Sequence, residues 1–522
     1  MNVRTASNYS LAHCRQWRVP AVVITAVVLL TAACSSGAGT ADSSDGASVL
    51  TLGSSYTPNS LDPAKINLAM QWYVDPAYDP LIYMAPDGSL RPGLATSWNY
   101  VGSGNKVFEL HLRPNVKFSD GSPLTADVLK ANIDYFRRNG MATASLLTTV
   151  SSVEVVNPTT VRLTLSASDP VLPQVFTQLN VAGDIVSGPA LKDPQKLATQ
   201  TFGAGPYELD AADSSAGSRY TYVPNPNYWN KTAVHYKKIV IEYLANENSR
   251  LAALKTGQID VMQATYATAS AAQSAGLHSA DAASTFTGLA LADRSGKLAR
   301  PLSDVRVRQA LNYAVDRKEL TTGLFGKYGI PTEQIVLPGQ AGYNSTNIYS
   351  YDPAKARQLL AEAGYPHGFT LPVITTSFVT SVVEAMADQL KAVGVTLKIT
   401  AASDANAYLQ GMTTAAYPAY GIGYGTQPIY IMGPGLFLPT AVFNPFHSSD
   451  PQVESLYKQS AAADSAAQPG LDKRLISRID EQAWFVPISF IPDFYYWNSS
   501  VSGVSLSTNR AVTDPVEFQP AR

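Results

Sequence analysis

Cysteine is nearly absent from this sequence, and histidine is rare. The 522 residues include two cysteines, Cys14 and Cys34, which excludes a disulfide framework. No pair of histidines beyond the N-terminal segment has the spacing of metal ligands. These histidines are His111, His235, His278, His367 and His447. We therefore expect no metal site, and nothing in the sequence calls for a cofactor.

An excess of basic residues is also missing. Lys and Arg together number 38 against 40 Asp and Glu, whereas a nucleic-acid-binding protein normally has a basic surplus. After residue 33 no stretch reaches 18 consecutive apolar residues, so a second membrane span is not expected. The hydrophobic content of 45% argues against a largely disordered chain.

The first 33 residues have the layout of a secretory signal peptide. Residues 1–18 contain Arg4, Arg15 and Arg18 and no acidic residue, and an apolar run follows at residues 19–30. Extended to residue 33, the run has about 15 residues, fewer than the ~20 that an α-helix needs to cross a bilayer. We predict a signal peptide at residues 1–33, with an uncleaved N-terminal membrane anchor as the alternative.

The residues around Cys34 resemble a bacterial lipobox, in which the signal is removed before a cysteine whose thiol is lipidated. The sequence LTAAC at residues 30–34 departs from the pattern at Thr31, where an aliphatic residue is preferred. Cys14 lies inside the removed segment, so the mature chain would have no internal disulfide. Residues 34–48 then form a flexible tether, because residues 35–48 contain no large apolar side chain and would span roughly 20 Å.

Hydrophobic periodicity predicts a mixed α/β body. Strand patterns occur at residues 49–52, 106–112 and 395–399, and residues 153–165 are typical of a hairpin. Helix patterns occur at 125–138, 304–324, 352–363 and 380–393, with Thr125, Asp304 and Asp352 as N-caps of the first three. Helices and strands alternate along the chain, which favours the mixed class.

Nine short motifs, in five groups, resemble the bacterial extracellular solute-binding proteins of the peptide/nickel-type ABC importers, the oligopeptide- and dipeptide-binding family. They appear in the order of that family between about residues 49 and 500. The motifs are LDP at 61–63, YDPL at 78–81, LATSW at 94–98, LRPNVKFSDG at 112–121, PLTADV at 123–128, GAGPY at 203–207, NPNYW at 225–229, ALKTGQIDV at 253–261 and DVRVRQALNYAVDR at 304–317.

The resemblance implies a two-lobed, periplasmic-binding-protein-like fold of the mixed α/β class. It places the first lobe at residues 49–75, 183–285 and 486–522, with an extra subdomain inserted at 76–182. The second lobe takes residues 286–485. The chain would then cross between the lobes near residues 286–288 and 486–489, and a bound ligand would favour closure of the two halves.

The function implied by the resemblance is that of a substrate-binding lipoprotein. It would capture a small solute, by family default a peptide or peptide-like compound, and deliver it to an ABC permease with its ATPase subunits. The chain would be a monomer, lipid-anchored at Cys34 on the outer face of the cell membrane, and would not be an enzyme. A solute sensor or protein-binding lipoprotein without transport is the first alternative, and nickel chelates remain candidate ligands.

Candidate ligand-binding residues lie mainly in the tyrosine-rich stretch at 417–430. In peptide-binding relatives this region carries a Trp and an Asp that holds the ligand's ammonium group, and neither occurs here. A neutral or differently charged ligand therefore fits better. The resemblance and the cleft chemistry select Tyr56, Tyr266, Phe286, Tyr420, Gly423, Tyr424 and Gln427 as ligand-binding candidates. The alternative for Tyr56, Tyr266 and Phe286 is ordinary packing or surface exposure.

An exported serine hydrolase is the second alternative. The sequence contains Ser455-x-x-Lys458, Ser103-Gly104-Asn105 and Lys255-Thr256-Gly257, fragments of the penicillin-recognising set. Their order is wrong for that chemistry, because the nucleophile motif comes last. We interpret Lys255-Thr256-Gly257 as a helix end.

Several family motif residues are expected to be structural. Trp98 and Trp229 are interpreted as core residues, while Arg306, Arg308 and Arg317 are expected on a solvated or ion-paired helix face.

Overall fold

One long mixed sheet organises the chain. The computed structural model describes residues 49–521 except 67, 141, 347, 465 and 511, so the predicted signal peptide, Cys34 and the tether lie outside the described residues. The sheet has the order β15-β14-β16-β12-β17-β11-β1-β10-β9-β8, with β13 added beside β17. Its strands are β1 (Leu50–Ser54), β8 (Tyr207–Leu209), β9 (Arg219–Pro224), β10 (Ile239–Tyr243), β11 (Val261–Ala264), β12 (His278–Leu291), β13 (Ile330–Pro331), β14 (Phe369–Thr375), β15 (Val395–Ala401), β16 (Ala419–Gly425) and β17 (Phe485–Trp497).

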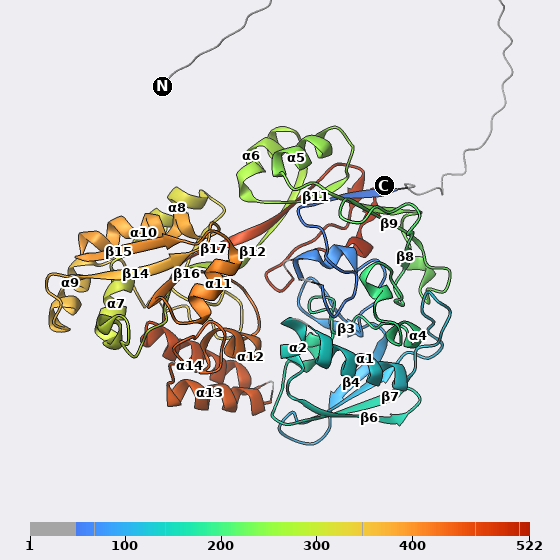
Figure 1. Cartoon of the computed structure of the whole chain (residues 1–522), viewed down its shortest axis with the longest axis horizontal. Coiled ribbons are helices and arrows are strands. Elements are labelled where there is room, and N and C mark those ends of the chain that lie inside the picture. The colour runs from blue at the N-terminus through green and yellow to red at the C-terminus, as the bar shows by residue number, and fades with distance from the viewer. Residues whose placement is uncertain are drawn as a thin grey trace, which may run out of the picture. The chain divides into compact units, whose positions relative to one another are not determined.

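The long strands β12 and β17 connect two lobes (Figure 1). They pair antiparallel from His278 opposite Trp497 to Ala290 opposite Phe485. At one end β17 also pairs with β11, and at the other end β12 pairs with β16. The predicted crossings near residues 286–288 and 486–489 fall on this strand pair; the exact lobe boundaries stay a prediction.

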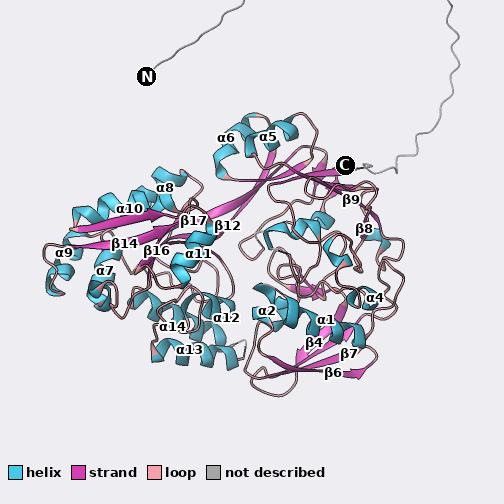
Figure 2. Cartoon of the chain, viewed as in Figure 1, coloured by secondary structure: helices cyan, strands magenta, loops and turns pink. Residues whose placement is uncertain are grey.

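The first lobe contains an inserted antiparallel sheet of order β4-β5-β7-β6. Figure 2 shows this sheet beside helix α1. The elements are β4 (Ala95–Tyr100), β5 (Val107–Leu112), β6 (Val150–Asn157), β7 (Thr160–Leu165) and α1 (Ala126–Asn139). The predicted hairpin at 153–165 is confirmed as β6 and β7.

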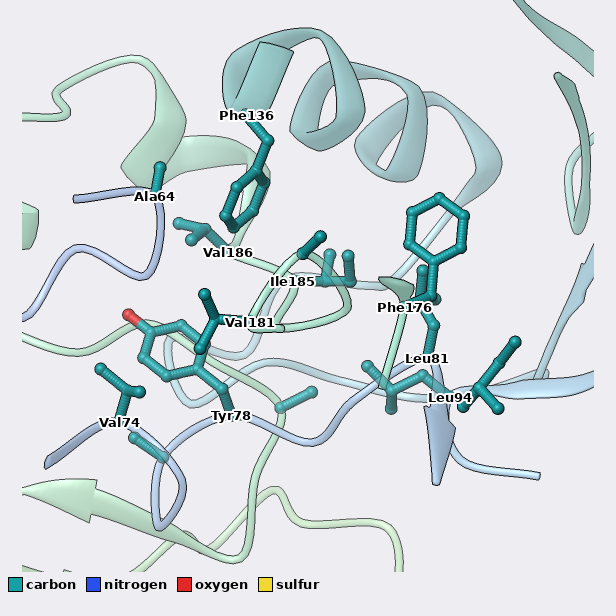
Figure 3. Packing of buried hydrophobic residues seen from close by; sticks show 14 of the residues in the cluster. Ala64, Val74, Tyr78, Leu81, Leu94, Phe136, Phe176, Val181, Ile185 and Val186 are labelled. Atoms are coloured by element: carbon teal, nitrogen blue, oxygen red, sulfur yellow. The ribbon is translucent and has the colours of Figure 1, made fainter. Parts of the chain in front are cut away.

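The remaining elements of the first lobe are short. They are η1 (Leu68–Tyr73), β2 (Ile82–Met84), β3 (Leu90–Pro92), α2 (Ala142–Leu146), α3 (Leu172–Val175), α4 (Gly188–Leu191), η2 (Lys196–Ala198), η3 (Lys231–Ala233), α5 (Glu247–Lys255), η4 (Tyr266–Thr268), α6 (Ala269–Ser274), β18 (Val501–Ser502), η7 (Pro515–Glu517) and β19 (Gln519–Pro520). One continuous hydrophobic cluster joins this lobe to its inserted sheet. In Figure 3, Tyr78, Leu81, Phe136 and Phe176 from three different segments contribute to it.

The second lobe places helices around β14, β15 and β16 (Figure 2). Its elements are η5 (Arg300–Ser303), α7 (Val305–Tyr313), α8 (Arg317–Phe325), α9 (Pro353–Glu362), α10 (Thr380–Ala392), α11 (Ala405–Thr413), α12 (Ile429–Met432), a π-turn at Gly433–Phe437, α13 (Pro451–Ala462) and α14 (Gln468–Glu481). Two separate cores form, one around Val307, Leu311 and Met386, the other around Phe286, Met432 and Trp484. No helix in the described ranges is long and apolar enough to cross a membrane.

Helix starts follow the predicted capping residues. The side chains of Thr125, Asp304 and Asp352 each accept a backbone N–H of the first helical turn. The single helix predicted at 304–324 is wrong, because the chain breaks after Tyr313 and restarts at Arg317. Asp316 caps the second helix by accepting the N–H of Glu319 at 2.9 Å, which favours the restart.

The expectation that Arg308 and Arg317 lie on a solvated or ion-paired helix face is also wrong. Both are almost fully buried, and burial lowers the pKa of each guanidinium to about 10. Arg308 donates to the carbonyl oxygens of Leu302 and Gln482, and Arg317 donates Nε to that of Pro487 at 2.8 Å. Through these hydrogen bonds the two arginines connect α7 and α8 to the beginning of β17 and the residues just before it. Of the three arginines, Arg306 alone is exposed, and it forms an ion pair with Asp304.

Candidate functional site

A cavity of about 460 Å³ has walls from both lobes. Its size is within the range of small-molecule sites. The first lobe contributes residues of η1, the β2–β3 hairpin, the segment after α3 and the loop at 508–512, and the second contributes residues 339–341 and 426–431. The lining residues are Ala69, Gln71, Met84, Gly88, Gln174, Leu179, Asn180, Gly339, Gln340, Ala341, Thr426, Gln427, Pro428, Ile429, Ile431, Thr508, Asn509 and Val512. A ligand here would contact both lobes at once.

The residues that follow β16 form part of the second-lobe wall of the cavity, and the end of this strand fixes their position. Thr426 donates its backbone N–H to the carbonyl oxygen of Ser284, the extra residue at a register shift in β12, at 2.5 Å. Pro428 follows and starts α12, which brings Ile429 and Ile431 to the wall. The strand pair that joins the lobes thus also fixes the segment that faces the cavity.

The first-lobe wall is fixed by side-chain amide contacts, those of Gln71 and Gln178 buried and that of Asn509 exposed. Gln71 donates Nε2 to the carbonyl oxygen of Gln178 at 2.8 Å, and Gln178 in turn bonds both backbone groups of Met84. Asn509 donates Nδ2 to the carbonyl oxygen of Asp87 at 3.2 Å. Segments that lie more than 400 residues apart in the sequence therefore form one surface.

The lobes also meet away from β12 and β17. Tyr430 of α12 donates its hydroxyl to the carbonyl oxygen of Ser168 at 2.6 Å. Asn105 donates Nδ2 to the carbonyl oxygens of Ala461 and Ala463, each at 3.3 Å, at the end of α13. Asn105 and Ser168 belong to the inserted sheet region, so this part of the first lobe contacts the second lobe directly.

A cluster of buried carboxyl groups follows the first-lobe wall residues in sequence. Asp75 lies four residues after Gln71, Asp514 lies two after Val512, and Asp184 lies four after Asn180. All three are at most 6% exposed, and both carboxyl oxygens of Asp184 lack a hydrogen-bond partner among the described residues. Burial raises the pKa of all three carboxyl groups. The neighbouring Asp514 raises the pKa of Asp75 and Asp184 further, while burial and Glu517 together bring the pKa of Asp514 to about 6.

Of the residues predicted to bind ligand, Gln427 lines the interlobe cavity. Gly423 and Tyr424 precede it on β16, where Gly423 is exposed and Tyr424 is half-buried. The Tyr424 ring lies 5.4 Å from that of Phe443 and 6.2 Å from that of Phe286, and burial raises its pKa to about 12. Their assignment as ligand-binding residues stays a prediction.

Phe286 and Tyr420 lie in the second-lobe core. Phe286 is fully buried, with its ring 6.1 Å from that of Phe485 and 6.3 Å from that of Phe490. Tyr420 is also buried and donates its hydroxyl to the carbonyl oxygen of Phe443 at 2.5 Å. Phe286, Tyr420 and Tyr424 thus join one aromatic cluster, in the same hydrophobic core as the cavity-lining Ile429.

Tyr56 and Tyr266 do not line the cavity. Tyr56 is 48% exposed, and its carbonyl oxygen accepts the hydroxyl of Tyr73 at 2.7 Å. Tyr266 is half-buried and packs edge-on against Phe325 with ring centroids 5.5 Å apart. The sequence does not single out Gln71, Asn180 and Asn509, because Gln71 lies in a short 3-10 helix and the two asparagines lie in turns, and none of these carries a periodic signal.

Three further cavities lie within single lobes. One of about 410 Å³ is lined by residues 315–351, one of about 720 Å³ by α13 and α14, and one of about 650 Å³ by α1 and α4. Among the described residues, no group of three His, Cys, Asp or Glu side chains is arranged to hold a metal ion.

Trp98 and Trp229 pack partly buried against the first-lobe core, and Trp229 donates Nε1 to Asp79 at 2.7 Å.

Comparison with known proteins agrees with this architecture. The sequence model for bacterial extracellular solute-binding proteins, family 5 (Middle), matches residues 89–435. The glutathione-binding protein GsiB of Shigella boydii serotype 4 is 29% identical over 364 residues, which cover 68% of this chain and 69% of that protein.

Two solved structures share the fold. The ABC transporter substrate-binding protein CtaP of Listeria monocytogenes has a TM-score of 0.78 at 20% identity, covering 92% of this chain and 100% of that chain. The periplasmic binding protein DppA of Helicobacter pylori, solved with the peptide STSA, has a TM-score of 0.73 at 20% identity, covering 91% of this chain and 99% of that one.

Proposed function

The chain belongs to the bacterial extracellular solute-binding proteins of family 5, and we propose that it captures a peptide or peptide-like solute between its lobes for an ABC importer. The observation that carries the proposal is the cavity with walls from both lobes. A ligand that contacts both walls has more partners in the closed arrangement than in an open one. It therefore favours closure by its differential affinity for the two states.

The direct contacts between the lobes support the same proposal. Tyr430 with Ser168, and Asn105 with the end of α13, form only when the lobes are close together. A permease that recognises surfaces on both lobes could then distinguish the loaded form from the open form. The relatives supply the ligand class, since GsiB is named for glutathione and DppA was solved with a peptide.

We further propose that the protein acts as a monomer, lipid-anchored at Cys34 on the outer face of the membrane. The segment at residues 34–48 would let the two-lobed body reorient toward its permease and ATPase subunits. The proposal assigns the chain no catalytic step, because its relatives are substrate-binding proteins of transporters.

Ligand-dependent stimulation of transporter ATPase tests the proposal. The full-length protein is reconstituted with its permease and ATPase subunits, and a mixture of short peptides is titrated in. We expect ATP hydrolysis to rise with ligand, and mass spectrometry to recover the ligand unchanged. Binding without stimulation would favour a sensor, and a chemically altered ligand would favour an enzyme. Neither outcome is compatible with the proposal.

A further inference from the structure

The interlobe cavity lacks a charged side chain among the described residues that line it. Its polar surface comes instead mainly from side-chain amides, which are neutral groups that both donate and accept hydrogen bonds. Six amide side chains contribute, from Gln71, Gln174, Asn180, Gln340, Gln427 and Asn509. Apolar side chains such as Met84, Leu179 and Ile429 lie between them.

The charged residues next to this lining in the sequence are engaged elsewhere. Arg510 follows Asn509 but is fully buried and pairs through two nitrogens with the carboxylate of Glu517. Asp87 precedes Gly88 and accepts the backbone N–H of Ser89 at 2.9 Å and its hydroxyl at 2.6 Å. Arg510 is thus neutralised by its partner, and neither Arg510 nor Asp87 belongs to the lining of the cavity.

Several polar side chains in the lining retain hydrogen-bonding capacity. Gln174 and Gln427, one on each wall, make no side-chain hydrogen bond with any described residue, and the same holds for Thr426 and Thr508. Such groups can pair with an amide or hydroxyl of a ligand at little electrostatic cost. An ammonium or carboxylate placed here would lose its hydration without gaining an opposite charge, which is unfavourable.

We propose that the ligand is an uncharged peptide-like solute, one whose ends are blocked or cyclised and which carries no ionised side chain. This inference rests on the proposed function and assigns its substrate class. The amides of both walls would pair with the ligand's amides, and the aliphatic side chains between them would contact its apolar groups.

The strongest competing group is Asp493. It lies exposed on β17, its side chain bonds Ser284, and the carbonyl oxygen of Ser284 accepts the N–H of Thr426 from the cavity wall. If a ligand ammonium were held near this wall, Asp493 would be its partner.

Matched peptide pairs test the charge class directly. Purified full-length protein is titrated by calorimetry with a panel of neutral-side-chain tripeptides, each with free ends and again as the N-acetyl, C-amide form, together with cyclic dipeptides. We expect at least one blocked or cyclic compound to bind 10-fold or more tightly than its free counterpart. Its affinity should change less than 2-fold between 0.05 and 0.5 M NaCl, because no ion pair is screened.

The failures are distinguishable. Binding of free-ended peptides equal to or tighter than the blocked forms overturns the uncharged class and leaves the proposed function standing. Absence of binding by both forms overturns the uncharged class and the peptide-like solute of the proposed function together.

Three variants test whether the preference for an uncharged ligand arises at the cavity wall. Gln427→Glu places a carboxylate on the second-lobe wall with almost no change in shape, and should weaken the blocked ligand at least 10-fold. Gln410→Glu makes the same change on the exposed face of α11 and should leave affinity unchanged. Asp493→Asn should also leave it unchanged, and a 10-fold loss in that variant would overturn the proposal. Thermal unfolding confirms that each variant folds.

Discussion

Gly288 of β12 lies directly opposite Pro487 of β17, at a register shift in the strand pair that joins the two lobes. A Cβ atom on Gly288 would lie 2.2 Å from the carbonyl oxygen of Val486. The second proline of β17, Pro492, lies opposite Ala283 at the other register shift. Proline has no backbone N–H to donate to the hydrogen bonds between strands. Both prolines therefore occupy positions where the pairing of β12 and β17 is already interrupted. These interruptions mark where the strand pair can bend.

Gly288→Ala should therefore destabilise the protein. The added methyl group has no space at 2.2 Å from a backbone oxygen, and the two strands must separate to admit it. Overpacking of this kind costs about 1–3 kcal/mol of unfolding free energy. Denaturant unfolding measures it. Gly323→Ala is the control, because nothing lies within 4 Å of its Cβ position in α8 and Ala is the better helix former there. Equal stability of the two variants would contradict the close approach.

Tyr430→Phe should weaken closure without weakening the second lobe. The variant loses the hydroxyl that Ser168 accepts at 2.6 Å, and a hydrogen bond of this kind contributes about 0.5–1.5 kcal/mol. We expect ligand affinity to fall roughly 2- to 10-fold and small-angle scattering to report a more open average shape. Tyr457→Phe is the matched control, since its hydroxyl bonds Tyr430 within the second lobe. A greater effect of the control on affinity would argue against a role in closure.

Much of the fold could be predicted where local signals suffice. Thr125, Asp304 and Asp352 begin helices because an oxygen side chain before an apolar periodic run satisfies free N–H groups. The sequence does not predict the break before Arg317, because residues 305–325 keep one apolar stripe across it. Asp316 is the local signal that could have revealed it, as a second capping residue inside the stripe.

The cavity could be predicted only in part, since its walls form through contacts between distant segments. Gln427, which lines the cavity, follows a glycine-rich strand and is a candidate through the resemblance. Gln71 and Asn509 lie 438 residues apart in a sequence that gives neither a motif. Tyr420 and Phe286 were selected for their chemistry, but aromatic side chains serve core packing equally well, and both are buried in this structure.

Cys34→Ser should release the protein from the membrane. The lipobox resemblance makes the Cys34 thiol the attachment point for lipid, and the described residues offer no helix that could replace it as an anchor. We expect the native protein in the membrane fraction, with a lipid mass increment on its first residue, and the variant in the soluble extracytoplasmic fraction. Ser36→Ala, two residues along the tether, is the control and should remain anchored. Membrane retention of Cys34→Ser would show that another segment holds the protein.

Stability should fall as the pH rises from about 4 to about 7, and Asp79 should account for part of this fall. Burial raises the pKa of its carboxyl group to about 7, although Trp229 and Tyr228 donate hydrogen bonds to it. Between its unfolded pKa of about 3.9 and this folded value, the folded state binds the proton more tightly. The free energy of unfolding therefore decreases through that window, by about 4 kcal/mol at most for a shift of this size.

Asp79→Asn isolates this contribution, because the amide keeps the shape and an acceptor oxygen but does not titrate. Its stability, measured by denaturant unfolding at several pH values, should depend less steeply on pH than that of the native protein. Asp514 and Asp169, whose pKa values burial raises to about 6, still titrate in this variant and preserve part of the slope. Asp388→Asn, on the exposed face of α10, should keep the native slope. If Asp79→Asn also kept the native pH dependence of stability, the carboxyl group would already be ionised in the folded protein across this pH range. Its two hydrogen bonds would then lower its pKa more than burial raises it.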